Sequence, residues 1–264
     1  MRNTIEQIKN HKKPLVCLTA YTTPMAASLD AHCDILLVGD SLGTVLYGMD
    51  NTTGVTLDMM INHGKAVAKT AKKACIVVDL PYGTYEESAE QAYSAARRVM
   101  DETGGDAVKL EGGIDMEAQI SYLVEQGIPV MGHIGLQPQS VIKDGGYKIK
   151  GKTDDSIAQL LADAKAVEDA GAFAIVIEGT IDDVATTITE SIGIPTIGIG
   201  ASAQCDGQIL VTEDMLGFTA GHIPKFAKQY AQIGFQIEQA AHQYAREVRE
   251  RSFPSSEYVY KKKT

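Results

Sequence analysis

The sequence predicts a β/α barrel, in which eight parallel strands close into a ring and each strand is followed by a helix. Short apolar runs alternate with helical patterns along the chain, and this alternation is typical of parallel strands joined by right-handed crossovers. The length of 264 residues suits one such barrel, which needs about 250 residues. No linker or shift in composition interrupts the pattern, so we expect a single domain over residues 1–264.

The expected strands are short runs rich in Val, Ile and Leu. Runs of this kind are typical of strands that are buried on both faces of a parallel sheet. The eight expected strands are residues 15–18, 35–38, 75–79, 107–110, 130–131, 174–177, 196–199 and 209–211.

The expected helices have apolar residues spaced for one face. A short helix at residues 4–9 precedes the first strand. The others are residues 24–31, 56–71, 88–102, 116–126, 154–170, 182–191, 224–233 and 235–251. Four glycines that precede a strand, Gly104, Gly127, Gly171 and Gly193, occupy the position of a left-handed helix C-cap.

Five apolar runs lead to a polar residue that can take part in chemistry. These residues are Asp40, Asp79, Glu111, His133 and Glu178, and Lys109 lies inside the third of these runs. In a β/α barrel the carboxyl ends of the strands meet at one mouth. A doubly wound open sheet, the alternative fold, would instead gather function at one switch point. The spread over five runs therefore favours the barrel.

Two of these carboxylates suggest a metal site. Asp40 and Asp79 follow neighbouring strands, and a hard cation such as Mg²⁺ uses one or two carboxylates together with water. Glu111 is placed to hold a metal-bound water. The alternative is that Asp40 and Asp79 only cap the turns after their strands.

Lys109, His133 and Glu178 are candidates for binding and catalysis. Lys109 should point into the barrel if its neighbours point out, and a buried lysine needs a partner. Glu178 follows four apolar residues, which raise the pKa of a carboxyl group and suit a general base. Each residue also has a structural interpretation: a Lys–Glu pair, a core histidine and a helix N-cap.

Two segments that contain several glycines are less specific. Residues 198–200, Gly-Ile-Gly, resemble a phosphate loop, although such glycines also serve tight turns. Residues 143–152 contain four lysines and three glycines. This segment is either a mobile lid over the mouth or a solvated surface loop.

The composition excludes some classes of partner. The formal net charge is −10, which argues against nucleic acid as the main partner. The polar N-terminus contains no signal-peptide pattern, and no apolar run approaches the roughly 20 residues that span a bilayer. The four cysteines, at 17, 33, 75 and 205, have no CxxC spacing. We expect free thiols, no membrane partner and a cytoplasmic location.

Seven motifs in uninterrupted order, from about residue 18 to about residue 230, resemble the ketopantoate hydroxymethyltransferase family. They are Leu-Val-Gly-Asp-Ser-Leu-Gly at 37–43, Val-Lys-Leu-Glu-Gly-Gly at 108–113, Gly-His-Ile-Gly-Leu at 132–136 with Pro-Gln-Ser at 138–140, Gly-Gly-Tyr at 145–147, Ile-Gly-Ile-Gly-Ala at 197–201, Asp-Gly-Gln at 206–208 and Gly-His-Ile-Pro-Lys-Phe at 221–226.

The resemblance implies a Mg²⁺-dependent barrel. It would transfer a hydroxymethyl group from 5,10-methylenetetrahydrofolate to 3-methyl-2-oxobutanoate, giving ketopantoate for coenzyme A synthesis. By matching motifs, Asp40 and Asp79 would be the metal ligands, with Glu111 bound through water, and Glu178 would be the base. Residues expected to contact the oxo acid are Asp40, Ser41, Asp79, Lys109 and His133. The family forms decamers, so a large homo-oligomer is implied.

The chain departs from the family pattern at two places near the mouth. Gln137 stands where threonine is expected, and Gly179-Thr180-Ile181 replaces the usual Cys/Gly-Val-Pro. Neither departure alters a residue with an expected chemical role. Two other functions stay open: a Mg²⁺-dependent carbon–carbon lyase acting on 2-oxo acids, and a non-catalytic scaffold that binds a metal or a metabolite.

Overall fold

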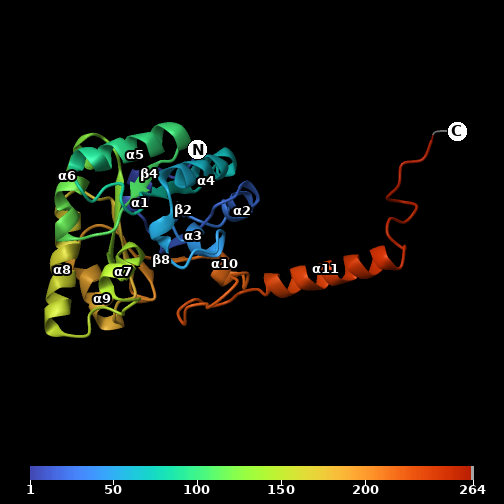
Figure 1. The fold of residues 1–264 in the computed structure, drawn as a ribbon. Helices are drawn as coiled ribbons and strands as arrows, with labels where there is room; N and C mark the ends of the chain where they lie inside the picture. Colours follow the sequence, from blue (N-terminus) through green and yellow to red (C-terminus); the bar gives the residue numbers. More distant parts are fainter. Residues whose placement is uncertain (263–264) are drawn as a thin grey trace. The chain divides into compact units, whose positions relative to one another are not determined.

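The computed structural model describes residues 1–262, and its strands form a closed parallel barrel in which β1 pairs with both β2 and β8 (Figure 1). The strands are β1 (Leu15–Thr19), β2 (Ile35–Val38), β3 (Cys75–Asp79), β4 (Ala107–Lys109), β5 (Val130–Gly135), β6 (Ala174–Glu178), β7 (Thr196–Ile199) and β8 (Gly207–Leu210). This closure confirms the predicted β/α barrel and excludes the open sheet.

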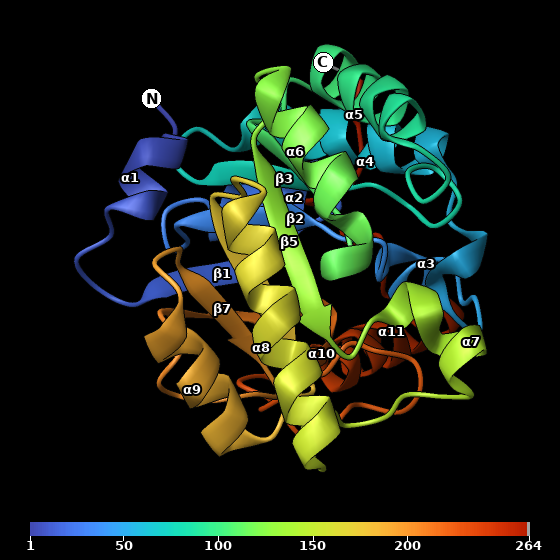
Figure 2. The same cartoon turned by 90° about the vertical axis from the view of Figure 1, so that its left-hand side faces the viewer.

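Within residues 1–212, helices surround the barrel, and Figure 2 shows α6, α8 and α9 on its outside. The α-helices are α1 (Ile5–Lys9), α2 (Thr23–Leu29), α3 (Leu42–Val45), α4 (Leu57–Thr70), α5 (Ala89–Thr103), α6 (Glu117–Glu125), α7 (Val141–Asp144), α8 (Asp154–Asp169), α9 (Asp182–Ser191), α10 (Thr212–Met215) and α11 (Ile233–Arg249). Short 3-10 turns are η1 (Thr52–Gly54), η2 (Ile114–Met116) and η3 (Pro138–Ser140). Within residues 1–262, no helix has the length and apolar character needed to cross a bilayer.

The chain divides into two compact units, residues 1–212 and residues 213–264. All eight strands lie in the first unit, and α11 lies in the second. The expectation of one domain over residues 1–264 stays a prediction.

Side-chain caps begin several helices. Thr56, Ser88 and Thr153 each accept a hydrogen bond from a backbone N–H of the first turn of α4, α5 and α8, which satisfies a donor that has no partner inside the helix. At the other end, Gly104 caps α5 in the left-handed conformation, at φ 69°. The prediction of such a cap was wrong for Gly193, because α9 ends in extended backbone at Ile192.

Side chains of the barrel strands alternate between two cores. In β2, Ile35 and Leu37 pack in the barrel interior, whereas Leu36 and Val38 pack against the helices. This alternation follows from the two-residue period of a strand. It determines which polar residues point into the barrel.

Most predicted ends differ from the structure by one or two residues, and three differences matter here. β5 continues to Gly135, so His133 lies inside a strand and not after one. β8 begins at Gly207, two residues before the expected run. The helix expected at residues 224–233 was wrong, because the N–H groups of Tyr230 and Ile233 donate to carbonyls of Met215 and Leu216 instead of to a helical turn.

Candidate active site

Four successive strands present polar side chains to the barrel interior. Asp79 on β3, Lys109 on β4, His133 on β5 and Glu178 on β6 each occupy an inward position of their strand. The inward position of Lys109 confirms the sequence prediction, since Val108 packs in the outer core. All four side chains lie toward the carboxyl end of the strands, as the barrel fold requires of a catalytic mouth.

Asp40 and Glu111 join these residues from the loops that follow β2 and β4. The backbone N–H of Asp40 donates to Oδ2 of Asp79 at 3.0 Å. Asp40 and Glu111 are each 5% exposed, and Asp79 is 2% exposed. The structure therefore brings the three predicted metal ligands into one buried region.

Close charged contacts connect the other members of the site. Lys109 Nζ lies 2.7 Å from Asp79 Oδ1 and 3.3 Å from His133 Nδ1. The same imidazole places Nδ1 3.4 Å from Glu111 Oε1 and Nε2 3.2 Å from Glu178 Oε2. Three carboxyl groups thus share one ammonium and one imidazole.

Burial and crowding shift the pKa values at this site. Burial, together with the charges of Asp79 and Glu111, raises the pKa of Asp40 to about 8, because Lys109 and the Gln139 hydrogen bond offset only part of this effect. Burial lowers the pKa of Lys109, but the surrounding carboxylates outweigh burial and the pKa is raised. Lys109 is therefore a permanent cation near neutral pH.

The surroundings of His133 also raise its pKa and favour the protonated imidazole. Burial and the Lys109 ammonium lower its pKa, but the carboxylates of Glu111 and Glu178 outweigh them and raise it to about 9. A protonated imidazole donates from both ring nitrogens. His133 can therefore serve as a hydrogen-bond donor to an anion held at the mouth.

Ser41 directly follows Asp40, and its Oγ lies 2.8 Å from the hydroxyl oxygen of Tyr21. A Cβ atom on the preceding Gly39 would come within 2.9 Å of Ser41 Oγ. The glycine in this motif therefore leaves room for the serine hydroxyl beside the carboxylates.

The loop at residues 143–152 approaches the end of β6. Its backbone is tied there, because Lys150 N–H donates to the Gly179 carbonyl and Ile181 N–H donates to the Lys150 carbonyl. Between these ties and α7, the Tyr147 ring is 56% exposed. The lid function of residues 143–152 stays a prediction.

Two buried polar residues of the site had no predicted role. Gln139, in η3, hydrogen-bonds both Asp40 and Glu111, and Tyr85 hydrogen-bonds Gln139. Gln139 lies in one of the family-like motifs, Pro-Gln-Ser, and that was its only signal in the sequence. No sequence pattern singled out Tyr85.

The donor atoms fit a hard divalent cation. Asp40 accepts a hydrogen bond only through Oδ2, and Asp79 Oδ1 is buried with no well-directed hydrogen bond within residues 1–262, although Lys109 lies beside it. No group of three or more His, Cys, Asp or Glu side chains in that range is arranged to hold a metal ion by itself. Mg²⁺ does not need one, since it is usually held by one or two carboxylates, water and substrate oxygens.

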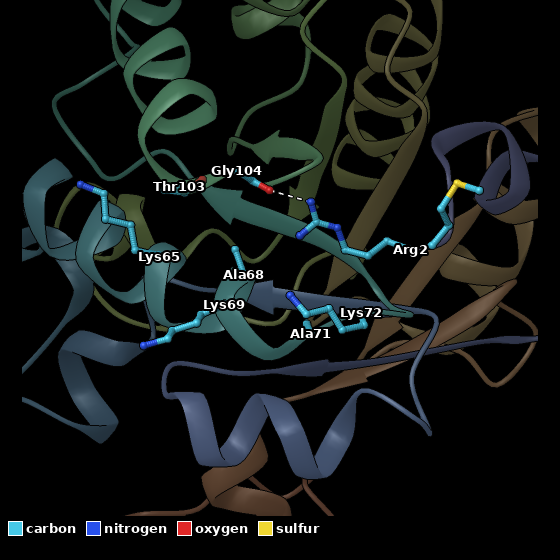
Figure 3. A pocket seen from close by; sticks show the side chains of 9 residues that line it. Arg2, Lys65, Ala68, Lys69, Ala71, Lys72, Thr103 and Gly104 are labelled. Carbon is cyan, nitrogen blue, oxygen red and sulfur yellow. Dashed lines mark hydrogen bonds between the residues drawn. The ribbon is translucent and has the colours of Figure 1, made fainter.

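A second polar hollow lies at the other end of the barrel. Arg2, Lys65, Lys69 and Lys72 line this space of about 480 Å³, where α4 and α5 end (Figure 3). Helices end near the amino ends of the following strands, so this hollow lies away from the carboxylates. Arg2 is already engaged, by the Gly104 carbonyl at 2.7 Å and by Asp106 at 3.0 Å.

Comparison with known families decides the assignment. The family model of ketopantoate hydroxymethyltransferase matches residues 1–256. The chain belongs to the ketopantoate hydroxymethyltransferase family. It is therefore an enzyme of the hydroxymethyltransferase type.

Several relatives of this hydroxymethyltransferase family are closely similar over nearly the whole chain. A 3-methyl-2-oxobutanoate hydroxymethyltransferase of Mesorhizobium japonicum is 61% identical over 247 residues, covering 94% of this chain and 86% of that protein. One of Rhizobium rhizogenes is 53% identical over 264 residues, covering 99% of this chain and 97% of that protein.

Solved structures share the barrel of this hydroxymethyltransferase family member at low sequence identity. A phosphoenolpyruvate phosphomutase from Streptomyces platensis subsp. rosaceus superposes with a TM-score of 0.62 at 12% identity, covering 98% of this chain and 92% of that one. A phosphonopyruvate hydrolase in complex with oxalate and Mg²⁺ gives a TM-score of 0.61 at 11% identity, covering 97% and 90%. These likenesses support the fold.

Proposed function

We propose that this enzyme transfers a hydroxymethyl group from 5,10-methylenetetrahydrofolate to 3-methyl-2-oxobutanoate, giving ketopantoate. The observation that carries the proposal is the meeting of Glu178 with a buried lysine and three further carboxylates at one barrel mouth. An oxo acid that loses a C3 proton needs a base, a cation for its oxygens and a donor for its carboxylate. The names of the close relatives support the oxo acid as substrate.

Three carboxylates would hold the cation. Asp40 and Asp79 would bind Mg²⁺ directly, and Glu111 would bind it through water, as the family motifs imply. Both Glu111 oxygens already face Gln139 and His133. When bound, Mg²⁺ would act as a Lewis acid toward the oxo acid and increase the acidity of its C3–H.

Glu178 would take the C3 proton. Among the site carboxylates paired with Lys109 or His133, Glu178 is the most accessible. Its side chain is 16% exposed, against 3% for Glu111 and Asp79. Lys109 would stabilise the negative charge that develops on the keto oxygen, and fixed charges of this kind usually supply the largest part of the rate enhancement. Ser41 and His133 would donate hydrogen bonds to the oxo acid.

The carbon–carbon bond then forms between substrate C3 and the methylene carbon of the folate. The bond from that carbon to one folate nitrogen breaks, and water breaks the bond to the other and supplies the hydroxyl group. The products are tetrahydrofolate and ketopantoate, so atoms and electrons balance without an external oxidant.

Exchange and turnover assays test this function against the two other candidates. The wild-type protein with Mg²⁺ should exchange the C3–H of 3-methyl-2-oxobutanoate in deuterated water and should form ketopantoate only when methylenetetrahydrofolate is added. A carbon–carbon lyase would cleave a 2-oxo acid without folate. A protein that neither exchanges the C3–H nor forms a product would be a non-catalytic scaffold. Burying so many ionisable groups for structure alone is costly, which argues against a scaffold.

We also propose a homo-oligomer, a decamer by family resemblance, located in the cytoplasm. The four cysteines are free and buried, which is consistent with a reducing compartment. Light scattering coupled to size-exclusion chromatography would measure the assembly, and a mass of one or two subunits would contradict the decamer.

A further inference from the structure

We propose that Gln139, oriented by Tyr85, is a positioning residue that holds Asp40 and Glu111 in the geometry needed for a divalent cation. The inference rests on the proposed function, because it concerns the same cation site. It assigns a purpose to two residues that neither contact the reacting atoms in the proposed mechanism nor have an expected role in the sequence.

The side-chain amide and the backbone N–H of Gln139 are all hydrogen-bonded, and the residue is only 4% exposed. Its backbone N–H donates to Glu111 Oε2 at 3.0 Å. Its side-chain Nε2 donates to Asp40 Oδ2 at 2.9 Å and to the Leu80 carbonyl at 3.0 Å. Its Oε1 accepts from the Tyr85 hydroxyl at 2.6 Å. A single residue of η3 thus ties together groups that follow β2, β3 and β4.

Tyr85 determines which way the amide points. Its hydroxyl oxygen accepts from Glu111 N–H at 3.2 Å, so the one hydroxyl proton is left to donate. Two acceptors compete for it, Gln139 Oε1 at 2.6 Å and the Glu111 carbonyl at 3.3 Å, and the shorter contact favours Gln139. With Oε1 facing Tyr85, both Nε2 protons must face Asp40 and Leu80.

The consequence is a defined orientation of each carboxylate, with one free oxygen left on Asp40. Asp40 is held by Oδ2 and keeps Oδ1 for a ligand, and Glu111 is held by Oε2 and turns Oε1 toward His133. Partners behind metal-binding carboxylates orient them, and removing such a partner typically weakens metal binding by about 10–100-fold. We expect the same of Gln139.

Cation titration tests this role without relying on turnover. Mn²⁺ alone, followed by electron paramagnetic resonance, would be titrated into full-length wild type, Gln139→Met, Tyr85→Phe and the double variant. Gln139→Met should weaken Mn²⁺ binding by about tenfold or more, and Tyr85→Phe by less. The double variant should bind Mn²⁺ less weakly than the two single losses combined predict, since Tyr85 acts on Asp40 through Gln139.

A matched control and a rescue separate positioning from folding. Gln119 on α6 is similarly buried, and within residues 1–262 its amide donates only to the Glu86 carbonyl, at 3.3 Å. Gln119→Met should therefore keep wild-type Mn²⁺ affinity. The kcat of Gln139→Met should recover toward wild type at saturating Mg²⁺, which a globally damaged protein would not do.

The outcomes that would overturn the proposal can be told apart. Wild-type Mn²⁺ affinity in folded Gln139→Met contradicts the positioning role alone. If wild type itself binds no Mn²⁺, the cation site of the proposed function fails together with this inference. If Gln139→Met does not fold, Tyr85→Phe decides, because it keeps the ring in place and removes only the hydroxyl group. Unchanged affinity in that variant overturns the proposal.

Discussion

His133 Nε2 lies 3.2 Å from Glu178 Oε2, off the line of a hydrogen bond. The Glu178 side chain is 16% exposed, against 4% for His133. It is therefore held near the imidazole by charge but is not locked to it. A carboxylate with this freedom can turn toward a substrate proton, which suits the proposed base.

Replacing Glu178 by glutamine should separate binding from proton transfer. The amide keeps the size of the side chain but cannot take a proton, so Glu178→Gln should bind 3-methyl-2-oxobutanoate and lose C3–H exchange by about 10²–10⁴-fold. Exchange would be followed by proton NMR in deuterated water. Unchanged exchange in this variant would remove Glu178 as the base.

Replacing Asp40 by alanine should abolish most cation binding. One of two direct ligands is lost, so Asp40→Ala should bind Mg²⁺ at least about 100-fold more weakly and lose Mg²⁺-dependent turnover. Isothermal titration with Mg²⁺ measures the affinity. Glu125→Gln, at an exposed position on α6, is the charge-matched control and should bind like wild type. Normal affinity in Asp40→Ala would show that Asp40 is not a ligand.

A methyl group at Gly135 should disturb the catalytic end of the barrel. Gly135 has φ 91°, and a Cβ there would lie 2.2 Å from the Glu178 carbonyl oxygen. Gly135→Ala should therefore lower the free energy of unfolding by about 2–4 kcal/mol and reduce C3–H exchange by displacing Glu178. Urea unfolding and the exchange assay measure the two effects.

Gly127→Ala is the control for backbone strain alone. Gly127 also has a positive φ, 78°, but a Cβ there meets no atom within 4 Å. It should cost only about 1–2 kcal/mol and leave exchange at the wild-type rate. If Gly135→Ala and Gly127→Ala changed the free energy of unfolding and the exchange rate equally, the contact with Glu178 would have no effect of its own.

Asp30 should stabilise the first unit in a pH-dependent way. Burial raises its pKa, but backbone N–H groups of Ala74, Lys72 and Lys73, at 2.8–3.1 Å, outweigh burial, so its pKa is lowered from 3.8. Asp30→Asn should therefore lower the free energy of unfolding by about 2 kcal/mol at pH 7.

The sign of the pH dependence follows from linkage. The folded-state pKa of Asp30 lies below the unfolded value, so its stabilisation is complete above about pH 4 and is lost as the pH falls through the folded pKa. Urea unfolding at pH 7, 5 and 3 should show a difference between wild type and Asp30→Asn that shrinks only at the lowest pH. A constant difference down to pH 3 and below would contradict this account.

Local pattern was enough for most elements because it reports burial directly. The runs at 35–38, 75–79 and 196–199 match β2, β3 and β7 residue for residue, and the run at 182–191 matches α9. The pattern failed at residues 224–233, where backbone N–H groups donate to carbonyls of Met215 and Leu216. It also failed at His133, because Gly132 and Gly135 interrupt the apolar run and concealed the continuation of β5.

The sequence alone predicted the barrel, the family and the six ionisable residues at the mouth of the barrel. It could do so because strand period and motif order are local properties. Only the tertiary structure decided which of these residues touch. Gln139 and Asp40 are 99 positions apart, and no local pattern encodes a contact that exists only because closure of the barrel brings the ends of separate strands together. The direction of the Gln139 amide, and with it the free oxygen of Asp40, depends on that closure.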